Sequence, residues 1–297
     1  MNFLVIGHSV VDKIIERELC SIKPGGIFYT VISLLSQILP EDKIFLCSNI
    51  DDKNTALFKE TYDRVEREFF NTVNSIPIVE LVVSESGERK ETYSEIAENL
   101  ILPKKDLDRF NGILINMITG YDLSLLQLKE LSKNYSGIIY FDVHTLSRSV
   151  DKKLNRIFKS IKNFSEWAKC IDILQTNESE LKTLSNKSKE ITIVEELFSY
   201  GIKQIVITRS EKGATVFCNE NDSIKSSHIN ALQVNTINKV GCGDVFGAVY
   251  FYNCIKNNKI QLALEQANLY AGISTTYSKA KDYINLKKDA HEWISEK

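Results

Sequence analysis

The chain has 297 residues, 43% of them hydrophobic and 26% charged, which is enough for a sizeable core and typical of a globular protein. Its formal net charge of -2 at pH 7 gives no reason to expect a nucleic acid or an acidic membrane as a partner. The sequence shows no leader pattern and no apolar run of about 18 residues, so it predicts a cytoplasmic protein without a membrane span. The 6 cysteines are scattered, without a C-x-x-C pair, which argues against a structural zinc site.

In chain order, short apolar runs alternate with segments of helical periodicity. The runs predict strands at Phe3–Ile6, Lys43–Cys47, Ile78–Val83, Ile113–Ile115, Ile138–Phe141, Ile171–Leu174, Gln204–Ile207 and Ala214–Phe217. Helical spacing occurs between them, as at Thr30–Leu39, Thr55–Phe69 and Leu123–Leu131, and the part from Asp244 onward reads mostly as helix. This alternation predicts an α/β fold with a largely parallel sheet covered by helices on both faces. The absence of a Pro/Gly/Ser linker favours a single domain over residues 1–297.

One segment departs from the alternation. Ile78–Val83 and Glu88–Tyr93 read as two strands joined by the turn Ser84-Glu85-Ser86-Gly87. The second arm is too polar for a central buried strand. Two interpretations stay open for this hairpin: a plain sheet edge, or a mobile cover over a site.

Polar residues follow most of the predicted strands, at the edge where open α/β sheets bind ligands. They are His8, Asp12, Asn116, Asp142, His144, Gln175, Asn177, Glu178, Glu180, Thr208, Arg209, Ser210 and Glu211. Because loops are generally polar, this collection does not by itself define a site.

The strongest local pattern is Gly241-Cys242-Gly243-Asp244 followed by an apolar helix from Val245 to Ile255. A helix that is apolar on nearly all sides lies deep in a protein, so its first N–H groups form a buried, partly positive cluster suited to phosphate. Glycines at 241 and 243 allow a tight turn and the close approach of a ligand. From these residues alone, Asp244 has two interpretations: a helix cap, or a base that takes a proton from a substrate hydroxyl.

Two other phosphate-binding motifs fit less well. The glycine spacing here is G-x-G-x-x-x-G and not G-x-G-x-x-G, and no acidic residue ends a second strand about 20 residues further on. No Gly-Lys-Ser/Thr is present to complete a Walker loop. A dinucleotide-dependent hydride transfer and a P-loop enzyme both become less favoured.

Several segments, in order and over essentially the whole chain, resemble the ribokinase-like (pfkB) carbohydrate kinase family. They are the Phe3–Asp12 run, Gly25-Gly26, Asn177-Glu178-Ser179-Glu180, Ile205–Gly213, Gly241-Cys242-Gly243-Asp244 and Ala267–Ser278. The resemblance implies a three-layer α/β/α sandwich with a small β lid, built from parts of 8–30 and 76–96. It also moves Asp244 from cap to base.

The same resemblance implies the roles of the site residues. Asp244 is the catalytic base, and Gly241, Cys242 and Gly243 form the anion hole. Asp12, Gly25, Gly26 and Thr30 bind the substrate. Asn177, Glu180, Thr208, Ser210, Gly213 and Asn268 bind ATP, and Asn177 and Glu180 also hold Mg²⁺ through water.

The chain departs from the family pattern at several positions. Asn238-Lys239-Val240 replaces the usual Asp-Thr-Thr or Asp-Pro-Thr, which puts a monovalent-cation site in doubt and leaves Lys239 facing either the phosphates or solvent. Other departures are Thr30 for a frequent Asn, Ser210 and Ala280 for frequent glycines, and Asp142-Val143-His144, with Arg148 beyond, for Asp-x-Asn and an Arg.

The activity implied is transfer of the γ-phosphate of ATP to a hydroxyl of a sugar, sugar phosphate or nucleoside-like molecule. The alternative is a non-catalytic nucleotide or metabolite sensor on the same fold. A homodimer through the lid is a further expectation, and the sequence does not specify the acceptor.

Overall fold

The computed structural model describes residues 1–16, 19–83, 89–93, 97–150, 152, 156–220 and 223–296. The predicted turn Ser84–Gly87 lies outside these residues. Within these ranges, none of the helices has the length and apolar character needed to cross a membrane.

The central sheet has nine strands in the described part of the chain, in the order β15-β14-β13-β12-β9-β8-β1-β4-β5. Their bounds are β1 Asn2–Ile6, β4 Lys43–Ile50, β5 Phe70–Thr72, β8 Gly112–Asn116, β9 Ile138–Asp142, β12 Ile173–Asn177, β13 Gln204–Thr208, β14 Ala214–Glu220 and β15 Ser223–Ile229. All neighbouring pairs from β5 to β13 are parallel, and β14 and β15 are antiparallel additions at one edge. The predicted, largely parallel sheet is therefore confirmed.

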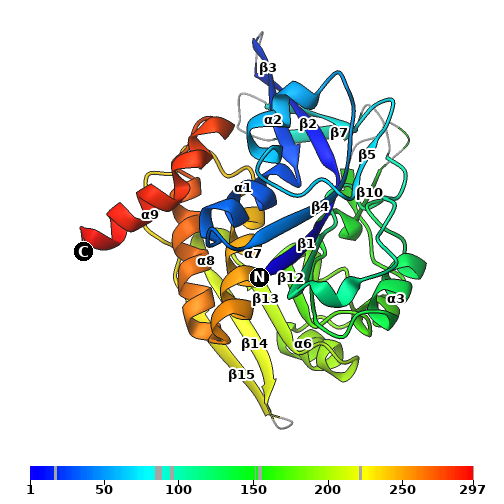
Figure 1. The fold of residues 1–297 in the computed structure, drawn as a ribbon. Coiled ribbons are helices and arrows are strands. Elements are labelled where there is room, and N and C mark those ends of the chain that lie inside the picture. The colour runs from blue at the N-terminus through cyan, green and yellow to red at the C-terminus, as the bar shows by residue number, and fades with distance from the viewer. Residues whose placement is uncertain are drawn as a thin grey trace.

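Helices cover both faces of this sheet (Figure 1). Their bounds are α1 Phe28–Gln37, α2 Thr55–Tyr62, α3 Leu125–Lys133, α4 Phe164–Ala168, α5 Glu178–Leu181, α6 Glu190–Ser199, α7 Cys242–Asn257, α8 Ile260–Ser274 and α9 Leu286–Ser295. Side chains of a strand alternate between faces, so Phe3 and Val5 of β1 pack with α1, α7 and α8, whereas Leu4 and Ile6 pack with α3, α4 and α6. Two apolar cores result, one on each side, as in a three-layer α/β/α sandwich.

A small second sheet stands at one end of the molecule (Figure 1, top). Its order is β3-β2-β6-β7, with β2 at Ser9–Glu16, β3 at Leu19–Gly26, β6 at Ile78–Val83 and β7 at Arg89–Tyr93. β7 pairs only with β6 among the described strands, so the polar arm is an edge strand, as the sequence indicates. A two-stranded hairpin, β10 (Arg148–Val150) with β11 (Arg156–Phe158), is absent from the sequence prediction.

Several predicted elements differ in their bounds from the structure, and two of these differences have a clear cause. The helix expected over Thr55–Phe69 ends at Tyr62, because the Glu66 backbone bonds to Ile44 and Leu46 of β4 and extends the sheet instead. The strand expected over Ile171–Leu174 runs over Ile173–Asn177, because the Ile171 N–H bonds back to Ala168 in a turn. Gln175 and Asn177 thus lie within a buried strand rather than after it.

Candidate active site

The start of α7 depends on a glycine. Gly241 precedes the helix with φ of 79°, a left-handed conformation that favours glycine. A Cβ on Gly241 would lie 2.5 Å from the ring of Tyr29, so the helix start packs directly on this ring. The helix is buried from Val245 to Cys254, as predicted. Its first N–H groups have no acceptor within the helix itself.

Asp244 is the third residue of α7, and the cap position belongs to Gly241. The cap interpretation of Asp244 is therefore wrong. Its Oδ1 instead accepts a hydrogen bond of 2.7 Å from Nδ2 of Asn116, the last residue of β8. Burial raises the pKa of Asp244 to about 7, the charge of Glu180 adds to this rise, and the Asn116 hydrogen bond opposes it. A carboxyl group with such a pKa is suited to accept a proton near neutral pH.

Two cavities meet at the start of α7. The larger, of about 720 Å³, is lined by Cys242 and Gly243. The smaller, of about 240 Å³, is lined by Gly241 and Asp244. A Cβ on Gly243 would contact nothing within 4 Å, so the backbone there faces open space. The anion-hole residues thus border both cavities.

Lys239 and Arg148 line both cavities. The Lys239 ammonium bonds to Glu211 at 2.6 Å, on the side of the larger cavity. The Arg148 guanidinium lies 3.9 Å from the Glu180 carboxylate and 5.1 Å from the centre of the Phe158 ring. Two positive side chains therefore stand at the junction, and Lys239 faces the cavities and not bulk solvent alone.

Two of the four predicted substrate-binding residues line the smaller cavity, whereas Gly25 and Thr30 do not. Asp12 of β2 and Gly26 of β3 line it, together with Val79 and Leu81 of β6. A Cβ on Gly25 would lie 2.4 Å from the Asp12 carboxylate, so that glycine makes room for the Asp12 side chain. Thr30 has an exposed fraction of 1% and lies behind Asp244, where its hydroxyl accepts from Asn116 at 3.2 Å.

Five of the six predicted nucleotide-binding residues line the larger cavity, and Glu180 does not. Asn177, Thr208, Ser210, Gly213 and Asn268 all line it. They come from the ends of β12 and β13, the turn before β14, and helix α8. Gly213 has φ of 89°, and a Cβ there would lie 1.8 Å from the Ile229 carbonyl, so only glycine fits this turn.

Asn177 and Glu180 form a capping box at the start of α5. Asn177 Oδ1 accepts from the Ser179 and Glu180 N–H groups, and Glu180 Oε2 accepts from the Asn177 N–H. These two residues thus have a structural role whatever else they bind.

Glu180 of this capping box is one of three carboxylates that repel one another; the other two are Asp142 and Asp244. Burial raises the pKa of Asp142, and the charges of Glu180 and Asp244 add to the rise. Burial also raises the pKa of Glu180. A divalent cation would relieve this repulsion. In the described ranges, no three acidic, Cys or His side chains are placed to ligate a metal directly.

Two buried amides belong to this site although the sequence analysis assigned them no role. Asn116 contacts Asp244, and Gln175 of β12 donates to the Gly243 carbonyl at 3.0 Å and to Asp142 at 2.9 Å. Their position at the carboxyl edge of the sheet was the available signal. The contact with α7, more than 60 residues later in the chain, was not readable from it.

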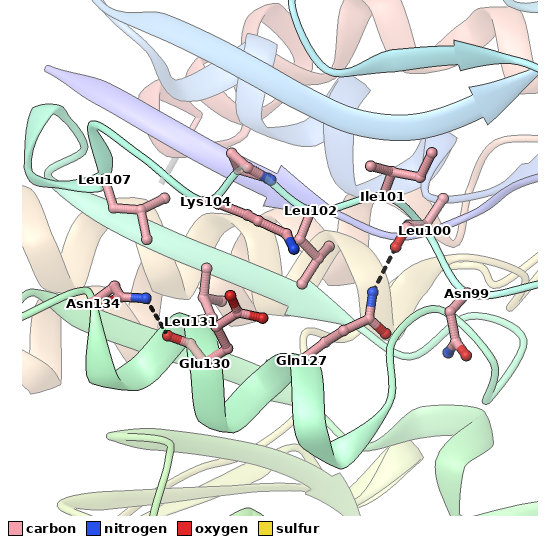
Figure 2. A pocket seen from close by; sticks show the side chains of 11 residues that line it. Asn99, Leu100, Ile101, Leu102, Lys104, Leu107, Gln127, Glu130, Leu131 and Asn134 are labelled. Carbon is pink, nitrogen blue, oxygen red and sulfur yellow. Dashed lines mark hydrogen bonds between the residues drawn. The ribbon is translucent and has the colours of Figure 1, made fainter.

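A third cavity, of about 290 Å³, lies away from this site, between the loop before β8 and helix α3 (Figure 2). Its lining residues are Asn99, Leu100, Ile101, Leu102, Pro103, Lys104, Leu107, Gln127, Glu130, Leu131 and Asn134. Gln127 closes one end by donating to the Leu100 carbonyl at 2.7 Å. None of the predicted site residues borders it.

Comparison with known proteins agrees with the geometry. Residues 142–286 match the model of a family described as pfkB family carbohydrate kinase. This part of the chain is thus similar to the pfkB family. The matched region contains Asp142, Asn177, Glu180 and the whole Gly241–Asp244 stretch. No curated protein sequence matches the chain.

Solved structures of ribokinases and a related kinase share the fold over most of the chain. The ribokinase of Thermotoga maritima has a TM-score of 0.77 at 16% identity, over 99% of both chains. A putative ribokinase II from E. coli, in complex with ATP and Mg²⁺, has a TM-score of 0.77 at 14% identity, over 100% of this chain and 99% of that one. A pyrophosphate-dependent kinase in the ribokinase family, complexed with a pyrophosphate analogue and myo-inositol, has a TM-score of 0.74 at 15% identity, over 92% and 94%. The chain described here thus shares the fold of each at low sequence identity.

Proposed function

We propose that this protein transfers the γ-phosphate of ATP to a hydroxyl of a sugar, sugar phosphate or nucleoside-like small molecule, with Asp244 as the base. The observation that carries the proposal is the position of Asp244, on an anion-binding helix start where a large and a small cavity meet. A donor in one cavity and an acceptor in the other bring phosphorus and hydroxyl together beside this carboxylate.

Each group at the junction then has a task. Asp12 binds acceptor hydroxyls in the smaller cavity. Asp244 orients the attacking hydroxyl and accepts its proton, while the N–H groups of Cys242 and Gly243 bind the phosphoryl oxygens. Arg148 and Lys239 offset the charge on the phosphates. Asn177 and Glu180 would hold Mg²⁺ through water, and the ion would supply further positive charge to the donor. Most of the acceleration comes from positioning and electrostatics, as is usual for phosphoryl transfer.

The shape of the larger cavity favours a nucleotide over pyrophosphate as donor. At about 720 Å³ it extends well beyond the phosphate-binding residues, to an apolar part lined by Leu232, Val234 and Ala271. Pyrophosphate would leave this apolar part empty, whereas a nucleobase would bury it. The donor is nevertheless tested directly, because one relative of this fold uses pyrophosphate.

The decisive experiment measures Mg²⁺-dependent turnover with ATP or pyrophosphate over a panel of sugars, sugar phosphates and nucleosides. Asp244→Asn is expected to lower kcat by about 10²–10⁴-fold while ATP binding persists. Near-normal turnover in Asp244→Asn, with a verified acceptor, would sink the base assignment. ATP binding by the wild-type protein without turnover on any acceptor would favour the sensor alternative.

A further inference from the structure

Two buried carboxamides contact the first turn of α7 from the central sheet. Asn116 ends β8 and Gln175 is the middle residue of β12, with exposed fractions of 1% and 3%. A buried N–H group needs an acceptor, so the contacts of the two amide nitrogens are strongly directional. The Asn116 Oδ1, in contrast, has no hydrogen-bond partner among the described residues. Both amides direct N–H groups at α7.

The Asn116 carboxamide contacts the side chain of Asp244. Its Nδ2 donates to Asp244 Oδ1 at 2.7 Å and to the Thr30 hydroxyl at 3.2 Å. This pairing fixes one oxygen of the carboxylate, and Asp244 itself lines the smaller cavity. A hydrogen bond to a carboxylate both fixes its rotamer and stabilises its ionised form.

The Gln175 carboxamide contacts the backbone of the same turn. Its Nε2 donates to the Gly243 carbonyl at 3.0 Å and to Asp142 Oδ2 at 2.9 Å, and its Oε1 accepts from the Tyr140 hydroxyl. Gly247 permits this approach, because a Cβ there would lie 2.5 Å from Gln175 Oε1. The turn that carries Asp244 is thereby tied to β9 and β12.

Charged and titratable groups face Asp244 from several elements. The carboxylates are Glu180 of α5, Asp142 of β9 and Asp12 of β2 across the cavity. The others are the Cys242 thiol, the Tyr283 hydroxyl of the 3₁₀ helix Ala280–Asn285, His144, Arg148 and Lys239. Neighbouring carboxylates disfavour an ionised Asp244, so a directed N–H donor is needed to keep it a base.

We infer that Asn116 and Gln175 are positioning residues for phosphoryl transfer: Asn116 holds the carboxylate of Asp244 and Gln175 holds the backbone that carries it. This inference rests on the proposed function of Asp244 as base. Neither amide lines the two cavities, so both act through Asp244 and not on the substrates.

The role of Asn116 is tested by titrating Asp244 directly. Carboxyl groups of ¹³C-labelled aspartate are followed by NMR from about pH 4 to about pH 9, and the Asp244 signal is assigned by its loss in Asp244→Asn. The wild-type pKa is expected at about 7. Asn116→Leu is expected to raise it by about one unit or more, because a hydrogen bond to the charged form is lost.

Asn253→Leu is the matched control. Asn253 lies in the same helix with an exposed fraction of 8%, and its amide bonds to Gln37 and Val249, far along the helix from Asp244. Asn253→Leu removes a carboxamide, as Asn116→Leu does, and is expected to leave the Asp244 titration unchanged. An Asp244 pKa that is equal in Asn116→Leu and wild type, with the fold intact, would overturn the positioning role of Asn116.

The role of Gln175 is tested by comparing Gln175→Leu with Tyr140→Phe. Both remove a hydrogen bond from the same cluster, but only the first releases the Gly243 carbonyl. Gln175→Leu is expected to lower kcat by about 10–100-fold with KM changed less than about 3-fold, since a small displacement of a reacting group is costly. Amide exchange at Val245, whose N–H bonds to Gly241, is expected to quicken in Gln175→Leu alone. Equal kcat and exchange in the two variants would refute the assignment.

These readouts separate the two proposals. Titration and amide exchange need no acceptor, so they decide the inference even if the wild-type protein transfers no phosphate. Turnover that depends on Asp244 but not on Asn116 or Gln175 would leave the proposed function standing and remove the inference.

Discussion

At the scale of single residues, the site is a cluster of charges in a buried place. Asp244, Glu180 and Asp142 repel one another, and burial adds to the cost of their ionisation. Such strain is common at catalytic sites, where function and stability compete. Its cost should be visible in the pH dependence of stability.

Asp244→Asn is expected to stabilise the protein at about pH 8. The folded-state pKa of Asp244, about 7, lies above the ordinary value of 3.8, so folding favours the protonated form. The wild-type protein therefore loses stability as the pH rises from about 4 to about 7, and the amide variant does not. Denaturant unfolding should show a difference of about 1–4 kcal/mol near pH 8 that disappears near pH 4. Equal stability of the two proteins near pH 8 would contradict the raised pKa.

Lys239 offers a second test at this scale. Its ion pair with Glu211 is exposed, and exposed pairs contribute little to stability, so both residues tolerate substitution. Lys239→Met is expected to raise the KM for the phosphate donor by about 10-fold, because a cation beside the phosphates is lost. Glu211→Gln frees the ammonium and should leave that KM unchanged or lower. An unaltered KM in Lys239→Met would place the side chain outside the donor site.

At the scale of elements, α7 has glycines that serve two purposes. Gly247 lets the helix approach β12, whereas Gly243 exposes the backbone to the larger cavity. Both lie in an apolar helix, and the sequence does not separate their roles. The space around each glycine in the structure separates the two roles.

Alanine substitutions at Gly243 and at Gly247 should separate the two roles by experiment. Gly247→Ala brings a methyl group to 2.5 Å from Gln175 and is expected to destabilise the protein by about 1–3 kcal/mol through overpacking. Gly243→Ala meets no atom within 4 Å and is expected to keep the melting temperature but weaken donor binding. Thermal unfolding and donor titration on both variants check this, and the reverse pattern would disprove the division of roles.

At the scale of the whole molecule, the two cavities are assembled from distant parts of the chain. The smaller one lies between the small sheet and α7, and the larger one between the ends of β12 and β13 and helix α8. A ligand in either should therefore stabilise the folded state as a unit.

A nucleotide is expected to raise the melting temperature more than pyrophosphate. Mg-ATP at about 100 times its Kd adds about 2.7 kcal/mol, or roughly 5 °C for a chain of this size. The shift should persist in Asp244→Asn, since the base is not needed for binding. A larger shift with pyrophosphate than with ATP would reverse the choice of donor.

Much of this architecture follows from the sequence itself. The alternation of apolar runs and helical periodicity predicts the parallel sheet, because strands buried on both faces need continuous apolar residues. The glycines and Asp244 ahead of the apolar helix predict a phosphate-binding helix start, because the motif is local and its chemistry is carried by adjacent residues. The fold is therefore encoded in patterns that can be recognised along the chain, and the same kind of pattern predicts the centre of the site.

Only the tertiary structure decided which residues contact Asp244 and what sets its pKa. Asp244 is not a cap, because Gly241 begins the helix, and its pKa near 7 arises from burial and from Glu180, a residue 64 positions earlier. Asn116 and Gln175 look like ordinary strand residues until β8, β12 and α7 come together. Long-range contacts and desolvation are properties of the packed molecule, and no local pattern in the chain encodes them.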